Sequence, residues 1–206
     1  LALRLRGALK LDALHAAFAA VSARHELLRS VYREVGGEPR RLVLACCPPG
    51  WAIDDAGAAD DATLDRLMRS EETTPFDLAQ QPPIRIRLIR LTPDDFILLL
   101  TIHHISFDGA SYDVLFRDLS RFYRAALHGR VVADAPPAAS YGDFVAWQRR
   151  FIDSAEAARQ LEYWNARLAP ADSAEITPDA LTTSAAPPNG RYVAIPLRSE
   201  TVVAMG

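Results

Sequence analysis

The residues best suited to chemistry lie close together, in the segment His103-His104-Ile105-Ser106-Phe107-Asp108-Gly109. Two adjacent histidines are followed, four residues after the second, by an aspartate, and Gly109 permits a tight backbone turn behind it. An imidazole with an unperturbed pKa of about 6.5 can take up and return a proton near neutral pH. The pattern therefore predicts acid–base chemistry at one of the two histidines.

Adjacent side chains at the end of a strand point to opposite faces, so only one histidine can face a given cleft. The other histidine should be tied into the structure, and strand geometry alone leaves open which of the two faces the cleft. A metal site is a weaker interpretation, because neighbours on opposite faces are badly placed to share an ion and no other cluster of histidine or cysteine offers ligands. A third interpretation, two histidines that serve only the fold, is weakened by the Asp-Gly that follows them closely.

The strand before these histidines must position them. Residues 96–102 form a nearly continuous apolar run, which is typical of a central strand. Residues 84–91 alternate apolar residues with arginine, the pattern of a half-buried strand, and the Thr-Pro-Asp-Asp sequence at 92–95 predicts a turn. We therefore expect an antiparallel hairpin whose second strand ends at His103.

The other elements follow from apolar spacing and turn residues. Helices are expected over residues 11–29, about 62–72, 111–128 with Ser111 as N-cap, and 141–168. Strands are expected at the start of the chain and at 31–35 and 41–45, the last two joined by a loop of more than two residues around Gly36-Gly37, with a loop over 46–61. The long helical stretch carries five large residues that we expect to be buried: Phe144, Trp147, Phe151, Leu161 and Trp164.

Composition excludes several classes of protein. The net charge is only −3, so bulk electrostatics do not favour nucleic acid or an anionic membrane as partner. Cys46 and Cys47 are adjacent, a poor geometry for a disulfide. No apolar run approaches the roughly 20 residues that span a bilayer, and no signal peptide is visible, so we expect a cytoplasmic protein without a membrane segment.

The segment from His103 to Gly109 resembles the HHxxxDG motif of the condensation domains of nonribosomal peptide synthetases, which belong to the chloramphenicol acetyltransferase-like superfamily. Residues 24–32 (RHELLRSVY) resemble the family's RHExLRTxF motif. Residues 75–78 (PFDL) with 83–85 (PIR) are similar to the segment before the central hairpin, and residues 141–149 (YGDFVAWQR) resemble YxDFAxWQ. Four matches in the expected order make chance a poor explanation.

The resemblance implies an α/β fold, a chloramphenicol acetyltransferase-like lobe with an open, mostly antiparallel sheet flanked by helices. Domains of this family have two similar lobes, and the motifs of the second half, including the FVNT-like segment, are missing here. We therefore expect a fragment, with residues 1–169 as the N-terminal lobe of a condensation domain and residues 170–206 as a linker and the start of a truncated C-terminal lobe.

The resemblance also implies the reaction: an amide bond forms between an acyl or aminoacyl thioester donor and an aminoacyl thioester acceptor, both held on the phosphopantetheine arms of peptidyl carrier proteins. His104, His103, Asp108 and Gly109 match the catalytic motif. The family suggests that Asp108 forms an ion pair with an arginine, and the motif arginines Arg24 and Arg29 are the candidates; we expect that pair to be buried. His25, inside the same motif, is most simply structural.

The expected partners are an upstream donor carrier protein, a downstream acceptor carrier protein and a neighbouring adenylation domain. No cofactor or metal is expected to bind the chain directly. Two alternatives stay open: a stand-alone acyltransferase of the same superfamily that uses acyl-coenzyme A, and a catalytically inactive domain that keeps the fold to dock carrier proteins.

Overall fold

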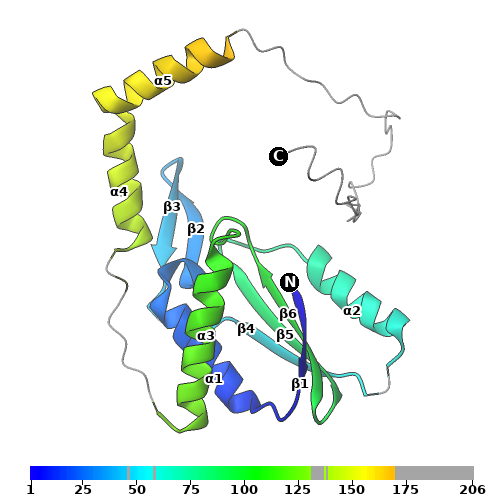
Figure 1. The fold of residues 1–206 in the computed structure, drawn as a ribbon. Helices are drawn as coiled ribbons and strands as arrows, with labels where there is room; N and C mark the ends of the chain where they lie inside the picture. The colour runs from blue at the N-terminus through cyan, green and yellow to red at the C-terminus, as the bar shows by residue number, and fades with distance from the viewer. Residues whose placement is uncertain (46, 58, 131–136, 138, 170–206) are drawn as a thin grey trace, which may run out of the picture. The chain divides into compact units, whose positions relative to one another are not determined.

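The computed structural model describes residues 1–45, 47–57, 59–130, 137 and 139–169 (Figure 1). By internal contacts the chain divides into two compact units, Leu1–Ala158 and Arg159–Gly206. Residues 170–206, expected to be a linker and the start of a truncated C-terminal lobe, lie outside the described residues.

Four strands form the main sheet, in the order β1 (Ala2–Arg6), β6 (Asp95–Ile102), β5 (Ile84–Thr92) and β4 (Gly50–Asp55). β6 pairs antiparallel with β1 on one side and with β5 on the other, whereas β4 pairs parallel with β5. The open, mostly antiparallel sheet is therefore confirmed, and so is the hairpin whose second, interior strand ends just before His103.

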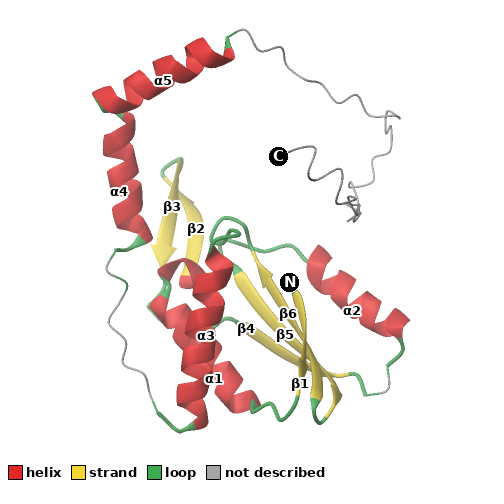
Figure 2. Cartoon of the chain, in the orientation of Figure 1, coloured by secondary structure: helices red, strands yellow, loops and turns green. Residues whose placement is uncertain are grey.

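The two faces of this sheet carry different side chains because successive residues of a strand alternate. Figure 2 shows the strands in yellow and the helices in red. Helices α1 (Leu11–Arg24) and α3 (Ser111–Leu127) pack against each other and cover the apolar face. On the opposite face, Arg85 and Arg87 of β5 reach Glu71 of helix α2 (Asp61–Thr73). The buried core joins α1, α3 and the sheet, and contains Leu14, Phe18, Val21, Ile84, Ile86, Leu88, Phe96, Leu98, Leu100, Leu115, Leu119 and Phe122.

Two predictions about the strands are wrong. β2 (Ser30–Val35) and β3 (Glu38–Val43) form a separate hairpin whose loop has only two residues. Gly36 and Gly37 allow it because both adopt positive φ, 64° and 81°, as a tight hairpin turn requires. The region expected to be a loop, 46–61, contains β4, which pairs with a single neighbour among the described strands and has too short an apolar pattern to stand out.

The helices follow the predicted order, but some of their bounds and caps differ from those predicted. α1 ends at Arg24, and a 3-10 turn, η1 (Glu26–Arg29), follows. The stretch 141–168 is two helices, α4 (Tyr141–Ile152) and α5 (Ala155–Leu168), because Ser154 accepts a hydrogen bond from the Ala157 N–H and starts a new helix. Ser140 and Asp143 form a capping box at the start of α4, and Ala110, not Ser111, is the N-cap of α3.

The aromatic side chains of α4 and α5 are not buried as expected. Phe144 and Trp147 are exposed, as are Leu161 and Trp164, and Phe151 is half-buried. Along α4 the rings contact one another instead, with centroids 5.5–5.7 Å apart from Tyr141 to Phe151. Within the described residues no helix is both long and apolar enough to cross a membrane.

Candidate active site

His103 is tied into the turn that follows β6, as expected for one of the two histidines. Its backbone N–H donates to the carbonyl of Pro83 (2.8 Å), and its carbonyl accepts from the N–H of Ser106 (3.1 Å). Its Nδ1 accepts a hydrogen bond from the backbone N–H of Ile105 (3.0 Å). An Nδ1 that accepts carries no proton, so the neutral ring must hold its proton on Nε2.

His104 lies at the exposed corner of the same turn, between the two residues that this hydrogen bond joins. The division of roles expected for adjacent residues at a strand end is therefore seen: one imidazole is used by the fold, and the other remains accessible. An accessible imidazole on a fixed turn can exchange protons with a bound group.

Asp108 takes a different role from the one expected. Its Oδ1 accepts hydrogen bonds from the hydroxyl (2.7 Å) and the backbone N–H (3.0 Å) of Ser111, at the start of α3. These bonds, the hydroxyl first, hold the pKa of Asp108 below its usual range, and the nearby His104 lowers it slightly further. Asp108 is exposed, and no arginine among the described residues pairs with it.

The expected buried pair between Asp108 and Arg24 or Arg29 is thus wrong. Arg24 pairs with Asp118 of α3, with Nε 3.1 Å from Oδ2. Arg29 donates to the backbone carbonyls of Ala23 and Leu44 and so holds the end of α1 against β3 and the residues after it. Both arginines support the fold near the site, although neither does so through Asp108.

Asp118 is the buried acid that the sequence interpretation missed. Its side chain is only 5% exposed, and it also accepts from Nε2 of His25 (2.8 Å) and lies 3.5 Å from Nε of Arg117. Burial raises the pKa of Asp118, but the hydrogen bond from His25 and the charges of His25, Arg24 and Arg117 outweigh it, so the pKa lies below its usual range. The available signal was an aspartate at a core-facing position of α3, among Leu115, Leu119 and Phe122.

Gly109 does not need the conformational freedom of glycine. It is absent from the glycines with positive φ, and a Cβ added there would meet nothing within 4 Å. The expectation that this glycine permits the turn is therefore wrong, because the bonds between Asp108 and Ser111 shape the turn without it.

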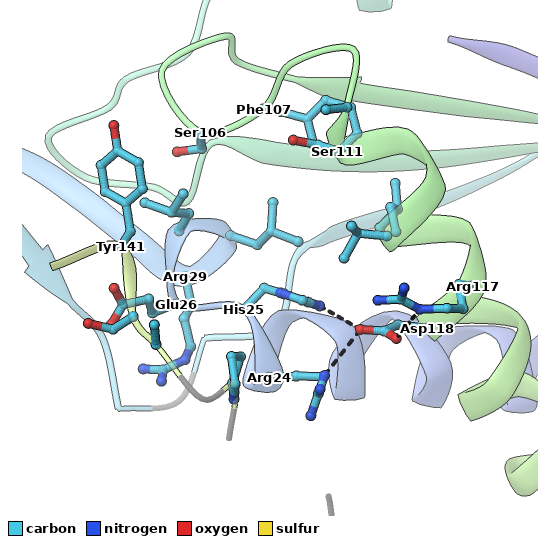
Figure 3. Close-up of a pocket in the computed structure, with 18 residues that line it drawn as sticks. Arg24, His25, Glu26, Arg29, Ser106, Phe107, Ser111, Arg117, Asp118 and Tyr141 are labelled. Carbon is cyan, nitrogen blue, oxygen red and sulfur yellow. Dashed lines mark hydrogen bonds and ion pairs between the residues drawn. The ribbon is translucent and has the colours of Figure 1, made fainter. Parts of the chain in front are cut away.

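A pocket of about 550 Å³ lies behind the motif, between the end of α1, η1 and the start of α3 (Figure 3). The motif contributes Ser106 and Phe107 to its lining, and Arg24, Arg29 and the Asp118 cluster line it too. His103, His104, Asp108 and Gly109 do not line it. Buried Ser106 links the motif to the RHELLRSVY segment, because its Oγ lies 2.9 Å from the hydroxyl of Tyr32.

Comparison with known proteins decides the family. The family model described as "Condensation domain" matches residues 1–201. The chain belongs to the condensation domain family. It is 42% identical over 181 residues to nonribosomal peptide synthetase kk1B of Curvularia clavata, and 42% identical over 182 residues to cyclosporin synthetase simA of Tolypocladium inflatum; these matches cover 87% and 86% of the chain.

A solved condensation-like structure matches the fold over the same part of the chain. The X-domain from teicoplanin biosynthesis is 31% identical with a TM-score of 0.78, and the match covers 87% of this chain; the X-domain from that biosynthesis has also been solved in complex with OxyB. This condensation domain chain spans about 1% of the length of each synthetase above and 40% of the X-domain chain.

The geometry predicts unequal losses of stability when two aspartates are replaced by asparagine. Asp118→Asn leaves Arg24, Arg117 and His25 without their counter-charge, so we expect a loss of roughly 1–3 kcal/mol, less than for a fully buried pair because Arg24 and His25 are still about a fifth exposed. Asp108→Asn is the matched control, because an asparagine can accept the same bonds from Ser111 and its melting temperature should barely move. Thermal melts of both variants measure this. A stable Asp118→Asn beside an early-melting Asp108→Asn would contradict the assignment and support a buried pair between Asp108 and an arginine.

Proposed function

We propose that this chain is the N-terminal lobe of a condensation domain that forms amide bonds between two carrier-bound substrates. Residues 1–169 make up the lobe with the HHxxxDG motif, and residues 170–206 are a linker and the start of the second lobe. The observation that carries the proposal is the accessible imidazole of His104 on a turn that His103 fixes. The membership in the condensation domain family supports it.

The proposed reaction joins the amine of an aminoacyl thioester to the carbonyl of an acyl or aminoacyl thioester. A C–N bond forms, the C–S bond of the donor breaks, the nitrogen loses a proton and the departing sulfur takes one up. A free amine is mostly protonated at neutral pH, and the addition intermediate must lose a proton before it collapses. A neutral imidazole at His104 can take that proton, or it can hold the amine and stabilise the tetrahedral intermediate.

The substrates follow from the same proposal. Donor and acceptor arrive on the phosphopantetheine arms of an upstream and a downstream peptidyl carrier protein, and an adenylation domain in the same synthetase loads them. The thioester supplies the driving force, so the proposed reaction calls for no metal or organic cofactor held by this chain.

A docking function is the second candidate, and one comparison favours it. The X-domain from teicoplanin biosynthesis, similar to this chain over 87% of its length, has been solved in complex with OxyB. A chain with that function would need the fold but not the imidazole of His104. The variants below therefore separate the two functions.

The first experiment tests whether one lobe suffices. If the reaction needs a cleft between two lobes, the chain alone should transfer no donor group, whereas a protein that joins it to a second condensation lobe should yield the amide. Charged donor and acceptor carriers are mixed with each protein, and mass spectrometry detects the dipeptide on the acceptor. Robust turnover by the monomeric chain would contradict the assignment to a single lobe.

The second experiment separates His104 from His103 in the two-lobe protein. His104→Ala should lower the single-turnover transfer rate by a factor of about 10²–10⁴, the usual effect of a positioned acid–base group. Its melting temperature should stay near that of the unchanged protein because His104 is exposed. His103→Ala should lower both, because it removes the acceptor of the Ile105 N–H. Full transfer by His104→Ala would favour the docking function instead.

A further inference from the structure

Arg85 of β5 holds the end of helix α2 and the residues after it. Its Nε donates to Oε1 of Glu71 (2.8 Å), and its Nη2 donates to the backbone carbonyls of Glu71 (3.1 Å) and Thr74 (2.8 Å). Its Nη1 reaches the carbonyl of Pro75 (3.3 Å). The planar, forked guanidinium thus satisfies carbonyls that the helix end leaves free, and it fixes the path of residues 74–76.

Phe76, the next residue along that path, lies between Arg85 and the motif. The guanidinium carbon of Arg85 is 4.0 Å from the centroid of its ring, a close cation–π contact. The ring also meets the imidazole of His103 at a centroid distance of 5.9 Å and an interplanar angle of 87°, a favoured edge-to-face arrangement. Phe76 therefore connects the guanidinium of Arg85 on one side to His103 on the other.

His103 can accept the Ile105 N–H only while its ring keeps one orientation, and Phe76 is the aromatic neighbour that contacts this ring. Residues 103 and 105 flank His104, so the orientation of the His103 ring sets the direction in which His104 leaves the turn. We propose that Arg85 and Phe76 are positioning residues for His104, acting through His103. This inference rests on the proposed function, in which His104 is the catalytic imidazole.

Arg85 lies in β5 close to the end of β6 from which the histidines follow. It stands next to Ile84, which pairs with Ile102 at the very end of β6, so the guanidinium is anchored to the same strand end that presents the histidines. The side chain is 17% exposed and Glu71 is 11% exposed, so the anchor is largely withdrawn from solvent. A lysine in this place would keep the charge but lose the fork that reaches several carbonyls at once.

The test uses two variants, Phe76→Leu and Arg85→Lys, with Phe76→Tyr as the conservative replacement that keeps the ring. Arg33→Lys is the matched control, because Arg33 donates to the carbonyl of Ala79 (2.8 Å) in the same segment and not to the carbonyls of residues 74 and 75 that Arg85 binds. Nitrogen NMR of the imidazoles in the chain reports the proton position on His103. Transfer kinetics in the two-lobe protein report kcat and the KM for each carrier.

Phe76→Leu and Arg85→Lys should change the single Nε2–H form of His103 to a mixture of both tautomers. They should lower kcat about 10- to 100-fold with little change in KM, because a small displacement of a catalytic group costs rate and not carrier binding. Phe76→Tyr and Arg33→Lys should keep both the tautomer and kcat.

Early melting of Phe76→Leu and Arg85→Lys with an unchanged His103 tautomer and unchanged kcat would overturn the proposal and leave these residues a role in the fold only. His104→Ala, assayed in parallel, keeps the two ideas apart. Full transfer by His104→Ala contradicts the proposed function, whereas lost transfer there beside a normal kcat in Phe76→Leu contradicts only the positioning. The His103 tautomer in the chain alone decides the structural step in either case.

Discussion

The hydrogen bond from the Ile105 N–H to Nδ1 of His103 is the contact on which the geometry of the HHxxxDG turn depends. It closes a turn directly after β6, and the backbone bond of His103 to Pro83 anchors the same turn to the start of β5. The His103 ring is held by this bond, and the neighbouring His104 is exposed at a fixed place in the turn. The ring of Phe76 lies against His103, and the guanidinium of Arg85 in β5 lies against Phe76.

The Asp118 cluster is a second constraint. It ties α3, whose first turn is bonded to Asp108, to the end of α1 through Arg24 and His25. The RHELLRSVY segment therefore supports the motif at both of its ends. Arg24 and His25 bind Asp118 of α3, and Tyr32 contacts Ser106 of the motif. The two motifs are therefore joined by a direct contact between residues 74 positions apart in the sequence.

The hairpin of β5 and β6 and the division between His103 and His104 were predictable, because both follow from local alternation along a strand. The partner of Arg24 was not, since Asp118 lies 94 residues away and an ion pair has no local pattern. The family resemblance predicted that an arginine would pair with Asp108, but Asp108 accepts hydrogen bonds from Ser111, three residues away. The sequence did not predict β4 for a similar reason, because this strand is specified by its parallel pairing with β5 and not by its own short sequence.

Chemical rescue tests the central claim, that His104 supplies the reacting imidazole while His103 holds the turn in its conformation. Free imidazole is added to the His104→Ala and His103→Ala variants of the two-lobe protein, and single-turnover transfer is followed as its concentration rises. Imidazole should restore part of the rate to His104→Ala, because it replaces the missing proton-transfer group, and should not restore His103→Ala, whose turn has lost its internal hydrogen bond. Rescue of His103→Ala with none for His104→Ala would contradict the account.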